Sequence, residues 1–167
     1  MRNKQKGFSL IELLIVVAII LIIAAIAIPN LIRSRMAANE ASAVAVLRTL
    51  NTSEVVYSTL YGGFSANLAN MGPGTTTCSS TVVPSATAAC LVDKVVGTDP
   101  STKSGYVTTY APGAAITGAS NGQVADYTIS STPQAIGSTG QRGFFTDQSL
   151  VIRADPSGTA TISSNPI

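Results

Sequence analysis

The sequence contains no histidine and no tryptophan, and only 11% of its 167 residues are charged. Because histidine is the usual general base near neutral pH, its absence removes the commonest arrangement for acid–base catalysis. The chain has two cysteines, Cys78 and Cys90, which without histidine or a second cysteine pair do not make a zinc site. Asp126, Asp147 and Asp155 show no spacing typical of a catalytic pair. We therefore expect neither an enzyme nor a bound cofactor or metal.

What the sequence does have is one long apolar run, Phe8 to Ile28, interrupted only by Ser9 and Glu12. These 21 residues form about 31 Å of helix, which matches the roughly 30 Å hydrocarbon core of a bilayer. The run is therefore predicted to span a membrane once. The remaining chain is long enough for one small domain.

Charge is distributed unevenly around this run. Residues 1–7, MRNKQKG, hold three of the ten basic residues and none of the eight acids, so the side chains from Phe8 onward sum to 7 − 8 = −1. Basic residues beside a first apolar segment favour a cytoplasmic N-terminus, whereas Arg33 and Arg35 on the far side oppose this slightly. Without the leader, the composition gives no reason to expect a nucleic-acid partner.

Glu12 is unusual because it lies inside the apolar run. A carboxylate at the centre of a bilayer costs roughly 2.5 to 3.5 kcal/mol on insertion scales, and less near the headgroups. Two interpretations follow: an acid tolerated near the membrane surface, or a functional group that needs a partner cation.

Gly7, Phe8 and Glu12 in KGFSLIE resemble the class III signal of the type IV pilin and pseudopilin family. The resemblance implies that prepilin peptidase cuts between Gly7 and Phe8, removing leader 1–7, and that Phe8 is then N-methylated. A secretory signal would instead be cut after its apolar run. Here residues 8–29 would remain, first as a membrane anchor and later as the filament core.

The resemblance also implies the partners and a role for Glu12. Expected partners are identical subunits in a helical homopolymer, prepilin peptidase, an assembly ATPase, platform proteins and the bacterial inner membrane. The methylated amine of one subunit could pair with Glu12 of its neighbour, since an unpaired buried charge is strongly unfavourable and the pair would fix the axial register. Pro29 is expected to kink the helix, or alternatively to start a second helix after a break.

Residues 30–62 are predicted to continue the helix in amphipathic form. Alanines favour helix, and Leu47, Leu50, Tyr57 and Tyr61 recur at three- and four-residue spacing, which predicts a stripe that packs on a globular head. Gly62 and Gly63 suit a left-handed helix end. The charged residues of this stretch are expected on solvated or subunit-facing surface: Arg33, Arg35, Glu40, Arg48 and Glu54.

Residues 63–104 are rich in Gly, Pro, Ser and Thr and carry both cysteines, and they are predicted to form an irregular connecting loop. Outside the cytoplasm, Cys78 and Cys90 are expected to form a disulfide, the alternative being two free thiols. Many type IV pilins close their disulfide near the C-terminus instead, so receptor binding by those pilins is not transferred to this chain.

Residues 105–167 are predicted to form an antiparallel sheet, so the fold class is α+β, a long N-terminal helix on a small sheet head. Asp155 to Gly158, DPSG, is expected to be a β-turn, the alternative being a calcium loop. The aromatic residues are expected to build the core rather than a stacking platform for nucleic acid. The expected strands are Tyr106–Tyr110, Tyr127–Ser130, Gly143–Thr146, Leu150–Arg153 and Ala160–Ser163.

The function that the resemblance implies is a structural subunit of a type IV pilus-like extracellular filament. Two alternatives stay open: a minor pilin or a pseudopilin of a type II secretion system, and a singly anchored extracellular binding domain. The protein is expected in the inner membrane with a cytoplasmic N-terminus before assembly, and afterwards in an extracellular pilus or periplasmic pseudopilus. Motility, adhesion, DNA uptake and secretion use similar subunits.

Overall fold

A computed structural model describes residues 8–74, 78–79 and 83–167. The predicted leader 1–7, including Gly7 of the cleavage site, lies outside these residues. The chain divides into two compact units, Met1–Arg35 and Met36–Ile167, and we call the second unit the head.

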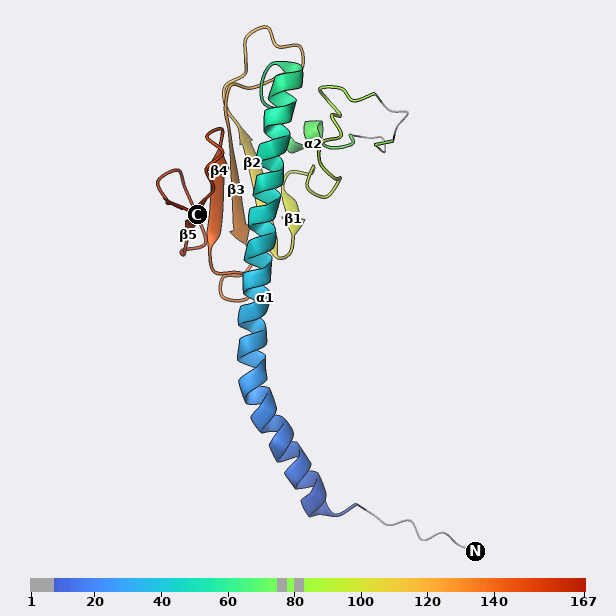
Figure 1. The fold of residues 1–167 in the computed structure, drawn as a ribbon, viewed down its shortest axis with the longest axis vertical. Helices are drawn as coiled ribbons and strands as arrows, with labels where there is room; N and C mark the ends of the chain where they lie inside the picture. Colours follow the sequence, from blue (N-terminus) through green and yellow to red (C-terminus); the bar gives the residue numbers. More distant parts are fainter. Residues whose placement is uncertain (1–7, 75–77, 80–82) are drawn as a thin grey trace, which may run out of the picture. The chain divides into compact units, whose positions relative to one another are not determined.

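Helix α1, Leu10–Tyr61, contains 52 residues (Figure 1). It begins after Ser9, whose carbonyl accepts the N–H groups of Glu12 at 3.1 Å and Leu13 at 3.3 Å. It ends at Gly62, which has a φ of 80° and donates its N–H to the Ser58 carbonyl at 2.9 Å. Glycine adopts this left-handed conformation without a steric penalty, so the predicted helix end is confirmed.

Pro29 lies inside α1, and the helix continues on both sides of it. The alternative in which Pro29 starts a second helix after a break is therefore wrong. Proline has no N–H to donate to the Ala25 carbonyl, but one missing bond does not end a helix whose adjacent turns are intact. The kink at Pro29 stays a prediction.

The head contains a six-stranded sheet in which every neighbouring pair is antiparallel and the strand order follows the chain, β1-β2-β3-β4-β5-β6. This confirms the α+β fold and the predicted antiparallel sheet. Figure 1 shows α1 running across the central strands. The strands are β1 Ser101–Lys103, β2 Tyr106–Pro112, β3 Tyr127–Pro133, β4 Gly143–Asp147, β5 Arg153–Asp155 and β6 Asn165–Pro166.

The last two predicted strands are shifted toward the C-terminus. Leu150 has a φ of 64°, and its N–H closes a turn onto the Asp147 carbonyl at 2.9 Å. The predicted strand Leu150–Arg153 is therefore wrong in its first residues, and β5 starts only at Arg153. The predicted strand Ala160–Ser163 is wrong as well, because pairing with β5 begins at Asn165.

The segment predicted as an irregular connection contains two regular elements. Helix α2, Leu68–Met71, is capped by Asn67, whose side chain accepts the Asn70 N–H. Strand β1 pairs with β2 through a two-residue turn at Ser104 and Gly105, both with positive φ. This turn type matches the twist of the strands it joins, which explains why a short polar segment becomes a strand.

Cys78 and Cys90 are joined by a disulfide, as predicted. The bridge lies beside α2, because the Cys90 N–H donates to the Gly72 carbonyl and the Leu91 N–H to the Met71 carbonyl at 2.7 Å. The disulfide-bearing segment is therefore attached to the head through the backbone that follows α2.

The core of the head lies between one face of α1 and the inner face of the sheet. The predicted stripe is confirmed, since Leu47, Leu50 and Tyr57 have no exposed surface and Tyr61 packs against the same cluster. Tyrosine and phenylalanine rings fill much of the rest of the core, as predicted from the sequence. The sheet contributes Tyr106, Tyr110, Tyr127, Ile129, Phe144 and Ala154.

Candidate functional site

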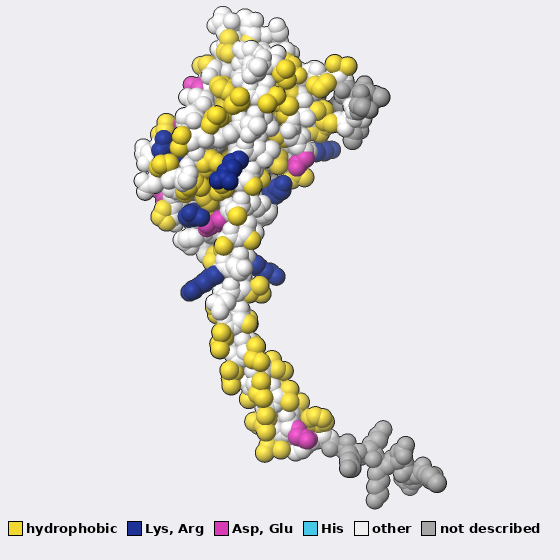
Figure 2. All heavy atoms as spheres, viewed as in Figure 1, with side chains coloured by type: hydrophobic (Ala, Val, Ile, Leu, Met, Phe, Trp, Pro, Cys, Tyr) yellow, Lys and Arg dark blue, Asp and Glu magenta, His cyan; other side chains and the backbone are white. Residues whose placement is uncertain are grey.

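The apolar segment, which we define as Leu10–Ile32, is the first candidate site. Its Leu, Ile and Val side chains are 44% to 80% exposed, whereas large apolar side chains of a globular protein are usually buried (Figure 2). By length and composition, α1 is able to cross a membrane. An apolar surface of this size marks a site of contact with lipid or protein.

Phe8 and Glu12 lie at the start of this segment. Phe8 precedes the helix and is 79% exposed. Glu12 accepts the Ser9 N–H at 2.9 Å, which is the reciprocal hydrogen bond of a capping box. Among the described residues, no Lys or Arg forms an ion pair with Glu12. The carboxylate therefore satisfies a free donor of its own helix, and its predicted role in register stays a prediction.

The prediction that Glu54 lies on solvated or subunit-facing surface is wrong, because its side chain has no exposed surface. The Ser65 N–H donates to its Oε2 at 3.0 Å, the Ser65 hydroxyl donates to its Oε1, and the Tyr110 hydroxyl donates to the Ser65 carbonyl at 2.7 Å. Burial raises the pKa of the Glu54 carboxyl more than the Ser65 hydrogen bonds lower it. Glu54 thus ties α1 to the segment that follows it.

A second buried polar group on α1, Asn51, connects the helix to the sheet. Its amide donates to Thr146 Oγ1 at 2.9 Å, and its carbonyl oxygen accepts the Tyr127 hydroxyl at 3.2 Å. Burial, followed by the nearby charge of Glu54, raises the pKa of the Tyr127 hydroxyl. These directional bonds select one position of α1 over the sheet, which apolar contacts alone do not specify.

Glu40 is also buried, contrary to the prediction. It accepts the N–H groups of Gln141 at 2.9 Å and Arg142 at 3.1 Å, and it pairs with Arg142 Nε at 2.8 Å. Burial alone would raise the pKa of the Glu40 carboxyl, but these donors and the guanidinium charge together lower it. The Arg142 guanidinium also lies 5.5 Å from the centre of the Phe144 ring. Arg33, Arg35 and Arg48 are exposed, as predicted.

The burial of Glu40 and Glu54 could have been predicted from their spacing in the sequence. Glu40, Leu47 and Glu54 are seven residues apart, so on a helix they lie on nearly the same face as the stripe that was predicted to be buried. Asn51 lies four residues after Leu47 and three before Glu54, so the same argument places it on the buried face. The acceptors and donors that satisfy them come from distant segments, which the spacing does not reveal.

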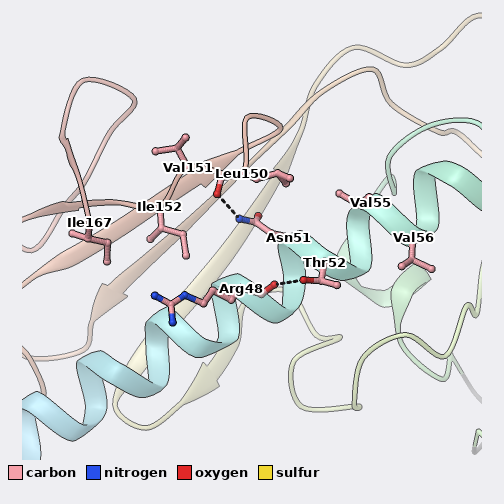
Figure 3. Close-up of a pocket in the computed structure, with 9 residues that line it drawn as sticks. All are labelled: Arg48, Asn51, Thr52, Val55, Val56, Leu150, Val151, Ile152 and Ile167. Carbon is pink, nitrogen blue, oxygen red and sulfur yellow. Dashed lines mark hydrogen bonds between the residues drawn. The ribbon is translucent and has the colours of Figure 1, made fainter.

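An open groove of about 710 Å³ lies on the head beside α1 (Figure 3). Figure 3 shows Val55 and Val56 on the helix, and Leu150, Val151 and Ile167 on the C-terminal part of the head. The residues lining the groove also include Arg48, Asn51, Thr52 and Ile152. Because Arg48 is its one ionisable side chain, the groove offers apolar contact rather than acid–base chemistry.

The DPSG sequence forms a turn, with the Gly158 N–H directed at the Asp155 carbonyl at 3.4 Å. Asp155 accepts the Ser157 N–H at 2.8 Å and the Ser164 hydroxyl at 3.3 Å. The Ser157 hydrogen bonds lower the pKa of the Asp155 carboxyl. Within the described part of the chain, no three acidic or cysteine side chains converge on one point. The β-turn interpretation of DPSG is confirmed.

Together these features define a class of protein. Its members have one N-terminal helix that is able to cross a membrane by length and composition, and this helix carries an α+β head. Residues 2–28 match the family described as the prokaryotic N-terminal methylation motif. The chain is 45% identical over 69 residues to the type IV wide pilus major component PilA4 of Thermus thermophilus. It is 49% identical over 51 residues to the type IV major pilin protein PilA of Myxococcus xanthus. The prediction from KGFSLIE is confirmed, because the chain carries this motif and is similar to type IV pilins.

These similarities cover part of each protein. The first match takes in 41% of this chain and 52% of its relative, and the second takes in 30% and 23%. The chain thus spans about half, or less, of the length of these relatives. No solved structure matches the chain.

Proposed function

We propose that the chain is a non-enzymatic structural subunit of a type IV pilus-like extracellular filament and polymerises through its N-terminal helix. The observation that supports this most is the exposed apolar segment, most of which lies within the methylation motif at residues 2–28. Such a surface is stable in lipid or against other apolar helices, and unstable in water. A subunit that leaves the membrane for a filament uses both surroundings in turn.

The first step is processing of the leader. Prepilin peptidase cuts between Gly7 and Phe8 on the cytoplasmic side of the inner membrane, and the new amine of Phe8 is methylated. The head lies on the other side of the membrane, where its disulfide is stable. An assembly ATPase and platform proteins then move the subunit from the bilayer into a helical homopolymer.

In that polymer, Glu12 sets the axial register. The methylated Phe8 amine keeps its positive charge and pairs with Glu12 of a neighbouring subunit among apolar helices. An unpaired charge there is strongly unfavourable, so one arrangement is favoured over its axial alternatives. The exposed position of Glu12 in the isolated chain leaves its carboxylate accessible to such a partner.

Two substitutions separate this role from capping of the helix. Glu12→Ala removes both the charge and the acceptor for the Ser9 N–H, whereas Glu12→Gln keeps an acceptor and removes only the charge. If register depends on charge, both variants lose most of the filaments recovered by shearing cells, while their membrane levels stay normal. Normal filament yield from Glu12→Gln would contradict the register role.

The function itself is tested by mass spectrometry of sheared extracellular material from the native host. We expect a chain that begins at methylated Phe8 and is two hydrogens lighter than its reduced form. Recovery only from membranes, with residues 1–7 attached, would overturn the filament and favour a singly anchored domain. A processed chain absent from surface fibres would favour a minor pilin or a pseudopilin of a type II secretion system.

A further inference from the structure

The C-terminal end of the apolar segment is marked by two arginines. Between Leu10 and Ile32, Glu12 is the one ionisable side chain, and Arg33 and Arg35 follow directly. The 23 residues of the apolar segment extend about 34 Å as a helix, which matches the hydrocarbon core of a bilayer. When this segment spans a membrane, both guanidinium groups therefore reach the level of the lipid headgroups.

The two arginines project from opposite sides of α1. Residues two positions apart on an α-helix are separated by about 200° around its axis. Figure 2 shows basic side chains on both sides of the helix just beyond the apolar surface. Arg33 and Arg35 are exposed, and among the described residues neither forms an ion pair with an acid.

This arrangement selects the kind of partner. A protein groove contacts one side of a helix, so it would leave one of the two cations without a partner. A layer of phosphate groups surrounds the helix and reaches both. Arginine binds phosphate through paired N–H donors, and its long side chain lets the charge stay at the surface while its methylene groups contact lipid.

We propose that Arg33 and Arg35 form a collar that binds acidic phospholipid headgroups and fixes the depth of the apolar segment in the membrane. The collar acts before assembly, and it does not depend on the chain forming a filament. It holds one end of the segment at the membrane surface, so the helix cannot slide toward the side of its basic leader.

The absence of tryptophan permits a direct measurement of depth in the full chain. Ile26→Trp places one fluorescent group in the apolar segment, and lipids with nitroxide groups at two depths quench it according to its distance from the bilayer centre. The chain is inserted into vesicles of phosphatidylcholine alone or mixed with phosphatidylglycerol. Both leaflets have the same composition, so either orientation gives the same depth.

Three changes are compared on the Ile26→Trp background. In mixed vesicles, Arg33→Gln with Arg35→Gln should move the tryptophan toward the centre by about 3 Å, the rise of two helical residues. Arg33→Lys with Arg35→Lys keeps the charges and should retain most of the original depth. Arg48→Gln is the control, because it removes an exposed cation of α1 that lies thirteen residues beyond Arg35.

The outcomes divide clearly. A shift confined to the double glutamine variant and to mixed vesicles supports the collar. Unchanged depth in that variant, or an equal shift in Arg48→Gln, overturns it. An equal shift in phosphatidylcholine alone would overturn the assignment to acidic headgroups. Salt at 1 M shortens the screening length to about 3 Å. It should therefore move the tryptophan of the Ile26→Trp chain, with both arginines present, toward its depth in the double glutamine variant.

Discussion

The two parts of α1 carry similar apolar side chains, but the chain covers those of only one part. Leu21 in the apolar segment is 63% exposed, whereas Leu50 in the head is completely buried. The head supplies the partners of its own helix from β2, β3 and β4. The apolar segment has to obtain its partners from lipid or from other molecules.

The acids of α1 show the same difference. Glu12 is exposed, and the one described hydrogen bond of its side chain is local. Glu54 is buried, and its carboxylate is bound by groups of Ser65. Burial of Glu54 requires donors that the fold brings from elsewhere, because an unsatisfied buried carboxylate is costly. The role of a glutamate on this helix therefore depends on whether the fold brings hydrogen-bond donors to it.

The largest effect that tests this difference comes from two leucines. We expect Leu50→Ala to lower the free energy of unfolding of the head by about 2 to 5 kcal/mol, because it leaves a cavity in the core. Leu21→Ala should change it by less than about 0.5 kcal/mol. Denaturant unfolding of the full chain in detergent micelles, followed by tyrosine circular dichroism, measures both. Equal losses from the two variants would show that the stability of the head depends on the apolar segment.

Removing the disulfide is the next test. Cys78→Ser with Cys90→Ser opens a loop with a sequence separation of 12. In the chain-entropy model a loop of this size stabilises the folded state by about 3 kcal/mol. We expect the melting temperature of the head to fall while membrane insertion, measured by carbonate extraction, stays unchanged. Loss of insertion would show that the two units are not independent.

The third test compares two glutamates. Glu54→Ala leaves the Ser65 N–H and hydroxyl without their acceptor, and we expect a loss of about 2 kcal/mol from the stability of the head. The loss is moderate, because the substitution also removes a carboxyl that is costly to bury. Glu12→Ala is the matched control and should leave the unfolding midpoint of the head unchanged. A stable Glu54→Ala head would mean that water replaces the carboxylate.

Much of the molecule was predictable from local patterns. KGFSLIE predicted the similarity to type IV pilins, and the apolar run located the helix that is able to cross a membrane. The spacing of Leu47 and Leu50 located the face that packs on the sheet. These features depend on residues close in sequence, where periodicity and composition are informative. The Gly62 helix end and the disulfide were predictable for the same reason.

The errors arose where distant residues decide the outcome. Glu40 was expected on solvated or subunit-facing surface because it is charged, but Gln141 and Arg142 bind it from about a hundred positions away. Leu150 was expected in a strand because it is apolar, but the turn that begins at Asp147 gives it a positive φ. Strand β1 was missed although Ser104 and Gly105, a common turn pair, were present.

The smallest effect concerns pH. The folded head raises the pKa of Glu54 above the ordinary value of 4.5. The protonated carboxyl therefore stabilises the head fully below pH 4.5, and this stabilisation is lost as the pH rises through the raised pKa. Between pH 7 and pH 5, Glu54 should therefore make the head more stable, with a slope below about 1.4 kcal/mol per pH unit. Glu54→Gln should lack this gain. Glu40 has a lowered pKa in the folded head, so its ionised form stabilises the head above pH 4.5, and this stabilisation is lost only as the pH falls through the lowered value. Glu40 therefore does not change the stability of the head between pH 5 and pH 7. Melting of both chains at pH 5, 6 and 7 measures the difference, and parallel curves would mean that Glu54 stays ionised throughout.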